Sequence, residues 1–89
     1  MTKSEKREQA IRNNPKNVRF EELDVFLRSY DFVGEPASSH VTYRHAGYAD
    51  LRITVVKPHG GANQVKVVYV REAIALVDSV KTQRAKEGK

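Results

Sequence analysis

The chain of 89 residues contains no cysteine, which excludes a disulfide scaffold, a thiolate metal cluster and a cysteine nucleophile. Long apolar runs are missing too, because the longest, residues 73–77, is far shorter than the ~20 apolar residues that cross a bilayer. The amino terminus leads into charged residues, so we expect no signal peptide and a cytoplasmic protein without a membrane partner. A chain of this length has room for one small domain with one core.

Charge is distributed unevenly along the chain. Sixteen lysines and arginines stand against eleven acidic residues, which gives a net charge of +5 and a pI near 9.7. An acidic segment, residues 20–36, lies between two basic ones. This pattern is typical of a protein that faces a polyanion with its basic elements and turns the acidic element away. The alternative interpretation is a solvated surface of mixed charge.

Helical spacing of apolar residues predicts two helices and one weaker extension. Residues 20–30 and residues 69–81 each carry an apolar stripe, and acidic residues favour the first turns of the earlier helix. Residues 4–14 are polar, so we expect a helix that packs weakly, with Ser4 as its N-cap and Pro15 as its stop. The charged residues 82–89 are expected to fray. The domain division is therefore an extension over 1–17, a main domain over 18–81 and a basic tail over 82–89.

Three strands are expected between these helices. Phe32 and Val33 suggest a short strand that ends at Gly34 and Pro36. Alternation with a period of two then predicts strands within residues 39–57, joined by a turn at 46–49. The predicted fold class is α+β: a small two-layer sandwich in which a three-stranded antiparallel sheet carries helices on one face, in the order α-β-β-β-α.

The alternation also defines which side chains point away from the core. That face is expected to carry His40, Thr42, Arg44, Arg52 and Thr54. Two registers keep the apolar residues inward: one places Arg44 opposite Asp50, and the other places Arg44 opposite Arg52. The second is unfavourable unless an anion lies between the two guanidinium groups. In either register, the imidazole, guanidinium and hydroxyl groups suit a phosphate backbone.

The three histidines differ in their settings. His40 begins a strand on the polar face, and an exposed imidazole can exchange protons at cellular pH. His45 follows the core-facing alternation, which favours a half-buried structural role. His59 lies in a Pro-His-Gly-Gly loop near Lys57, where it is either simply exposed or in contact with phosphate. His40 and His45 fall on opposite strand faces and cannot chelate one metal together, so we expect neither a metal nor a cofactor.

Four stretches of the chain resemble the HicA family of bacterial toxins, and the order of elements resembles the double-stranded-RNA-binding fold. They are residues 18–32, 39–45, 51–59 and 65–77, which together span roughly residues 16–80. Members of this family are small RNA-cleaving proteins, each paired with a HicB antitoxin. The resemblance implies a metal-independent endoribonuclease that cleaves mRNA and binds a HicB-type antitoxin. It also implies that the main domain, residues 18–81, is HicA-like.

The resemblance maps the catalytic histidine of the family onto His40, and the serine before it onto Ser39. The chain differs from the usual pattern at Ser38, where glycine is usual, and at Ala37, where a basic residue is frequent. RNA contacts are expected from Ser39, Thr42, Arg44, Arg52, Lys57 and His59. Either His59 or a lysine could be the acid that protonates the leaving group, and the sequence does not decide between them. Two alternatives remain open: a non-catalytic RNA-binding module, and a protein-interaction module that docks a partner through its charged segments.

Overall fold

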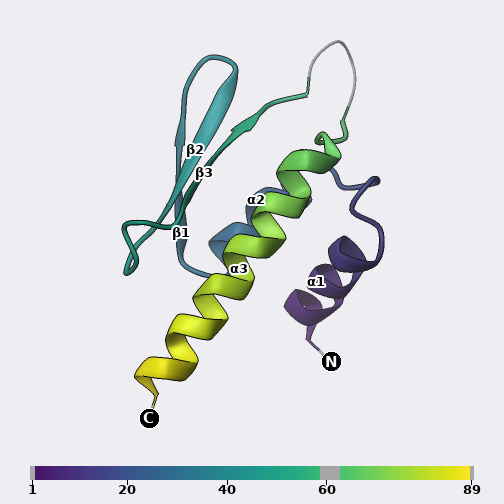
Figure 1. The fold of residues 1–89 in the computed structure, drawn as a ribbon. Coiled ribbons are helices and arrows are strands. Elements are labelled where there is room, and N and C mark those ends of the chain that lie inside the picture. The colour runs from purple at the N-terminus through teal and green to yellow at the C-terminus, as the bar shows by residue number, and fades with distance from the viewer. Residues whose placement is uncertain (1, 59–62, 89) are drawn as a thin grey trace.

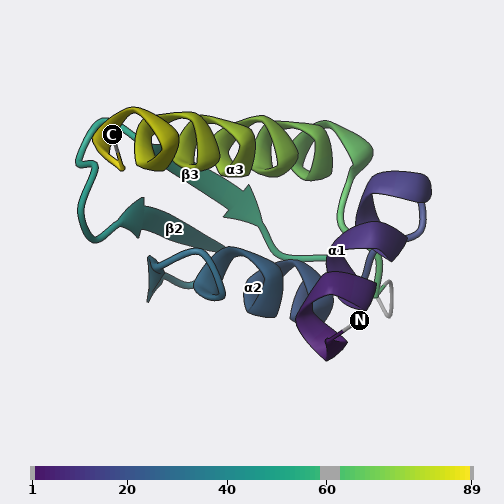
Figure 2. The same ribbon diagram turned by 90° about the horizontal axis from the view of Figure 1, so that it is seen from below.

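A computed structural model describes residues 2–58 and 63–88, and it contains three helices and three strands in those ranges (Figure 1). The elements are α1 (Lys3–Asn13), α2 (Phe20–Arg28), β1 (Phe32–Pro36), β2 (His40–His45), β3 (Arg52–Val56) and α3 (Val67–Glu87). The strands form one antiparallel sheet in the order β1-β2-β3. Helices α2 and α3 cover one face of this sheet, and α1 lies beyond them (Figures 1 and 2). The predicted α+β sandwich is confirmed.

The core lies between the sheet and the two covering helices. Alternate residues of β2 and β3 point into it, and apolar stripes on α2 and α3 meet them. Its members from these four elements are Leu23, Phe26, Leu27, Val41, Tyr43, Ile53, Val55, Val70, Ala73, Val77 and Val80. The one deeply buried hydroxyl of the middle strand is satisfied, because Tyr43 donates to Asp24 Oδ1 over 2.6 Å.

Strand β1 is longer than its sequence indicates. It runs through Gly34 to Pro36, so the expected break at these two residues is wrong. The strand lies at the edge of the sheet, where a proline can end a strand without removing an inner hydrogen bond. Asp31 joins α2 to β1 with φ of 69°, a left-handed conformation that aspartate adopts more readily than most residues. The chain therefore turns sharply from helix into sheet at this point.

Helix α1 belongs to the same packed unit as the rest of the chain. Its N-cap is Thr2 and not Ser4: Thr2 Oγ1 accepts the Glu5 amide at 3.2 Å, and the Glu5 carboxylate accepts the Thr2 amide at 3.1 Å. The expectation of weak packing is also wrong, since Ile11 is 1% exposed and part of the core. One apolar side chain thus anchors a helix that is otherwise polar.

Glu8 connects α1 to α3 and to the segment that follows α2. Its carboxylate accepts hydrogen bonds from Arg12 Nε at 2.9 Å, from Lys81 Nζ at 2.7 Å and from the Tyr30 hydroxyl. Arg12 extends the network to Asp78 on α3 at 2.7 Å. Burial alone would raise the pKa of Glu8, but the bonds from Lys81, Tyr30 and Arg12 outweigh it and lower this pKa to about 2. The polar face of α1 is therefore held by charge-assisted contacts.

Helix α3 continues to Glu87, so the expected fraying after residue 81 does not occur within the described residues. Val80 is the last buried residue of the helix, and two polar contacts hold the exposed turns that follow it. Arg84 pairs with Asp31 in the α2–β1 connection, and Glu87 accepts a hydrogen bond from the Tyr48 hydroxyl at 3.0 Å. The charged end of the chain is helical because distant parts of the fold supply its partners.

Candidate nucleic-acid interface

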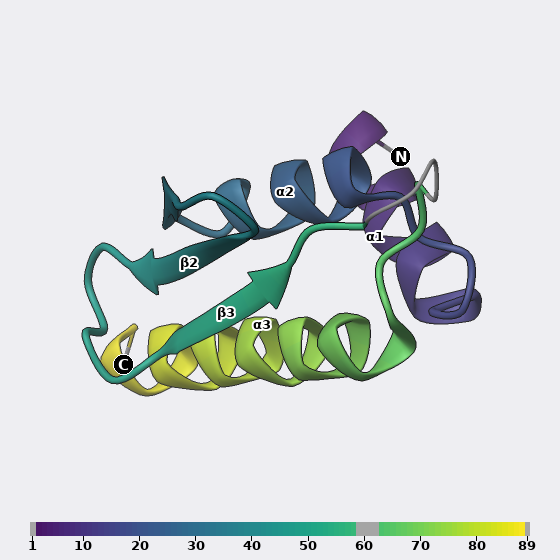
Figure 3. The ribbon, with the colours of Figure 1, turned by 90° about the horizontal axis from the view of Figure 1, so that it is seen from above.

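The register of β2 against β3 brings two arginines face to face. Of the two predicted registers, the structure has the one that places Arg44 opposite Arg52. The Lys57 amide donates to the Ser39 carbonyl, and the His45 amide donates to the Leu51 carbonyl, both at 3.0 Å. By alternation, Arg44 and Arg52 form a non-hydrogen-bonded pair, in which the Cα atoms are only about 4.5 Å apart and the side chains are closest. Figure 3 shows the two strands running in opposite directions.

Eight side chains form the face of the sheet that no helix covers, which we call the exposed sheet face. Cross-strand partners share a face, so the registers arrange these residues in three rows. The rows are Val33, Arg44 and Arg52; then Glu35, Thr42 and Thr54; then His40 and Val56. The middle row contains a direct contact, with the hydroxyl oxygens of Thr42 and Thr54 3.2 Å apart. Predicted site residues from two strands therefore come together here.

Arg44 and Arg52 on the exposed sheet face belong to the arginines that form no ion pair among the described residues, together with Arg7, Arg19 and Arg71. Arg12, Arg28 and Arg84 each contact a carboxylate. Neither Arg44 nor Arg52 forms an ion pair with any residue that the structure describes. Glu35 lies one row away from Arg44, and it too has no ion-pair partner in the described ranges. Two guanidinium groups thus face each other with their charge uncompensated.

His40 lies at the opposite end of the same face. It is the first residue of β2 and partly buried, and its carbonyl accepts the Ala37 amide at 2.8 Å. Arg44 is four positions further along the strand, which corresponds to about 13 Å between the two Cα atoms. The imidazole and the arginine pair therefore lie on the same face of the sheet. They are too far apart for one small group to contact both.

Ser38, which stands where glycine is usual in the HicA family, lies in the turn before His40. Ser38 and Ser39 are the two residues between the bonded positions Ala37 and His40. Within residues 2–58 and 63–88, Asp31 is the only residue other than glycine with a positive φ. The turn consequently does not use the left-handed conformation for which glycine would be needed. Serine at position 38 introduces no backbone strain ahead of His40.

Ser39 and Lys57 are not part of the exposed sheet face. Both continue the core-facing alternation of their strands beyond the end of the sheet, and the Ser39 carbonyl accepts the Lys57 amide. Lys57 lines a cavity of about 220 Å³ beside the start of α2, together with Phe20, Glu21, Pro58 and Asn63. His59, the remaining predicted RNA contact, lies outside the described residues.

His45 is more buried than expected and has a structural task. Only 7% of it is exposed, and its Nδ1 accepts the backbone amides of Gly47 at 3.0 Å and Tyr48 at 3.1 Å. The ring stacks on Tyr48 with centroids 4.7 Å apart and meets Phe32 edge-on. Because Nδ1 accepts, Nε2 carries the proton, and this buried atom has no partner among the described residues. His45 holds the β2–β3 turn in shape.

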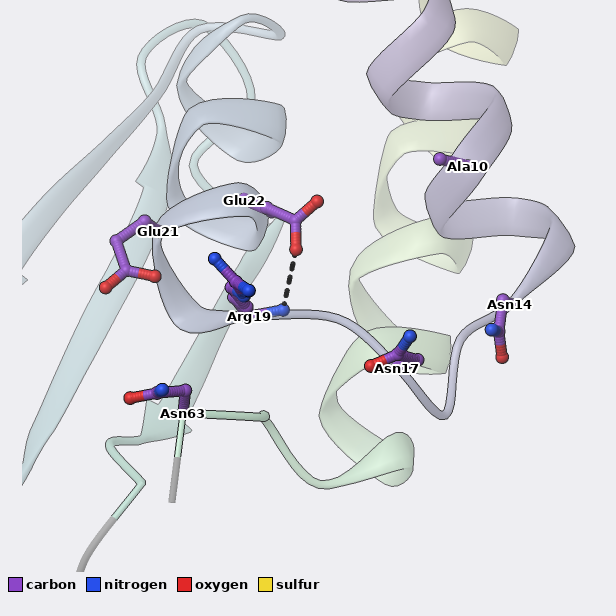
Figure 4. A pocket seen from close by; sticks show the side chains of 7 residues that line it. All are labelled: Ala10, Asn14, Asn17, Arg19, Glu21, Glu22 and Asn63. Atoms are coloured by element: carbon purple, nitrogen blue, oxygen red, sulfur yellow. Dashed lines mark hydrogen bonds between the residues drawn. The ribbon is translucent and has the colours of Figure 1, made fainter. Parts of the chain in front are cut away.

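A larger cavity lies at the start of α2, and sequence reasoning missed it. It has a volume of about 760 Å³ and is lined by Ala10, Asn14, Asn17, Arg19, Glu21, Glu22 and Asn63 (Figure 4). The Glu22 carboxylate accepts the Arg19 amide at 3.0 Å and so caps the helix. The lining comes from three separate segments without a common motif, and it offers amides and charges of both signs.

No three His, Asp or Glu side chains gather in a metal-binding arrangement within residues 2–58 and 63–88. None of the helices that the structure describes is long and apolar enough to pass through a bilayer. Compared with known proteins, the chain matches no family model, and no curated protein or solved structure is significantly similar to it.

Proposed function

We propose that this protein is a metal-independent endoribonuclease of the HicA type, the toxin of a cytoplasmic toxin–antitoxin pair. The observation that carries the proposal is the position of His40 on a helix-free sheet face that also bears the unpaired Arg44 and Arg52. A polyanion is the natural ligand of such a face. The resemblance of residues 16–80 to the HicA family and the α-β-β-β-α order support the same function.

The proposed reaction is an internal transesterification of RNA. The 2′-hydroxyl attacks the adjacent phosphorus while His40 removes its proton, the bond to the 5′-oxygen breaks, and a 2′,3′-cyclic phosphate remains. A general base of this kind contributes about 10²–10⁴-fold to the rate. The leaving 5′-oxygen takes a proton from an acid that we leave open between His59 and a lysine. DNA has no 2′-hydroxyl and should not be cleaved.

Charge on the reacting phosphate needs a cation close to His40. Arg44 and Arg52 lie about 13 Å away along the strands, so they are poorly placed for this task. Lys57 is nearer along the backbone, because its amide is bonded to Ser39, the residue before His40. Lys57 nevertheless continues the core-facing alternation, on the opposite side of the strand from His40, so we assign RNA binding to the two arginines and leave the cation at the transition state open. A HicB-type antitoxin would neutralise the protein by covering the exposed sheet face.

The test is single-turnover cleavage of a structured mRNA in the presence of EDTA. We expect the parent protein to produce cyclic phosphate ends, His40→Ala to lose at least about 100-fold in rate, and DNA of the same sequence to stay intact. Arg71→Gln on α3 is the control for a substitution away from the face, and circular dichroism checks the fold of each variant.

A cleavage rate that His40→Ala leaves unchanged would overturn the role of His40. If the parent protein binds the RNA without cutting it, the domain is a non-catalytic RNA-binding module.

A further inference from the structure

We infer that Arg44 and Arg52 together form a clamp for one RNA phosphate that is not the phosphate cleaved at His40. The substrate would then be a strand of several nucleotides that crosses the exposed sheet face from the arginine pair to the imidazole. This inference rests on the proposed function for the identity of the ligand as RNA.

The energetics of the arginine pair support an anion between its members. Like charges directly opposite each other in a sheet destabilise it, and the non-hydrogen-bonded position brings the two side chains closest. No carboxylate among the described residues forms an ion pair with either arginine. A phosphate can accept hydrogen bonds from both planar guanidinium groups at once, which turns a repulsive pair into a binding site.

The middle row indicates the path of the strand. Glu35 lies beside Thr42 on the β1 side and repels phosphate, whereas Thr54 on the β3 side offers a hydroxyl. The contact between the Thr42 and Thr54 hydroxyls bridges the two strands midway between the arginine pair and His40. The RNA backbone should therefore run over β2 and β3, and Glu35 should keep it away from β1.

The separation of the two ends sets the length of RNA that can use both. A span of about 13 Å between the Cα atoms of His40 and Arg44 equals about four nucleotides at the ~3.4 Å spacing of a stacked strand. An extended strand would need fewer nucleotides. A dinucleotide held at His40 cannot reach the clamp in either case. Affinity should thus rise with length and then level off once both ends are occupied.

The test measures binding of labelled single-stranded RNA, from a dinucleotide to an octanucleotide, to the His40→Ala protein, which does not consume its ligand. Adding Arg44→Gln and Arg52→Gln should weaken octanucleotide binding at least tenfold and abolish the rise with length. The slope of log K against log salt should fall by about 0.7, the value for one lost phosphate contact on a single strand. Adding Arg71→Gln instead, at an exposed arginine on α3, controls for the loss of a positive charge away from the exposed sheet face.

The outcomes separate the clamp from the catalytic proposal. If the double arginine variant binds the octanucleotide as tightly as the Arg71→Gln control, or keeps the same dependence on length, the clamp is refuted. That result would leave cleavage by the parent protein untouched. If the clamp behaves as expected but the parent protein cuts no RNA, the catalytic role of His40 fails and the binding assignment stands.

Discussion

Replacing one arginine of the opposed pair should make the protein more stable. Two unit charges about 6 Å apart in water repel each other by about 0.7 kcal/mol, which agrees with the cost of like charges in cross-strand positions. Arg52→Gln removes this repulsion and keeps part of the aliphatic stem over the strand. A domain of this size gains about 4–8 °C per kcal/mol, so the midpoint of thermal unfolding should rise by about 3–6 °C.

Salt provides the decisive measurement for this prediction. At an ionic strength of about 0.01 M the repulsion acts nearly in full, whereas at about 1 M the screening length falls to about 3 Å and little repulsion remains. The parent protein, Arg52→Gln and Arg71→Gln should be melted under both conditions. The advantage of Arg52→Gln over the Arg71→Gln control should be present at low salt and disappear at high salt. A variant that melts no higher than the control at low salt, or an advantage that survives high salt, would refute the reasoning.

Three further substitutions test other contacts. Glu8→Gln should lower the free energy of unfolding by about 1–2 kcal/mol at neutral pH, after allowance for solvent screening. The pKa of Glu8 in the folded protein, about 2, lies below the ordinary 4.5. Denaturant titrations should therefore find the difference between parent and variant intact above about pH 5 and lost as the pH falls toward 2. An unchanged difference at pH 2 would contradict the network. His45→Ala should cost about 2–4 kcal/mol in urea unfolding, because two turn amides lose their acceptor and the ring leaves a cavity; a cost below about 0.5 kcal/mol would show that water replaces the ring. Glu35→Gln should tighten RNA binding several-fold in a fluorescence titration, and unchanged affinity would remove Glu35 from the RNA path.

The exposed sheet face could be predicted from the sequence because the period of a strand is two. Once Val41 and Tyr43 were assigned inward, the outward positions of His40, Thr42 and Arg44 followed. The register could not be settled in the same way. Both candidate registers bury the same apolar residues, and they differ only in whether Arg44 meets Asp50 or Arg52. The arginine pair, which the structure shows, is the choice that local charge disfavours.

The ends of the chain were harder to predict because their partners are far away in the sequence. The sequence around Glu8 does not predict its contact with Lys81, and the sequence around Arg84 does not predict its contact with Asp31. Such pairs depend on the finished fold, whereas helical periodicity reports only the apolar stripe of a segment. Ile11 is a single apolar residue in a polar helix, and one such residue only weakly indicates that the helix packs on the core. Hydrophobic spacing therefore does not predict how a polar helix packs when ion pairs hold it in place.

Opposite faces of the same strands have different roles in this small domain: one face packs into the core, and the other is the exposed sheet face. Inward residues of β2 and β3 build the core, and the side chains of Arg44 and Arg52 have no ion-pair or hydrogen-bond partner in the part of the chain that the structure describes. We therefore expect substitutions on the exposed sheet face to change the proposed binding of RNA without unfolding the protein. A merely structural pair would lose stability and binding together. Opposite signs, a gain in stability with a loss of affinity, would mark the arginine pair as a site shaped for a ligand that the free protein lacks.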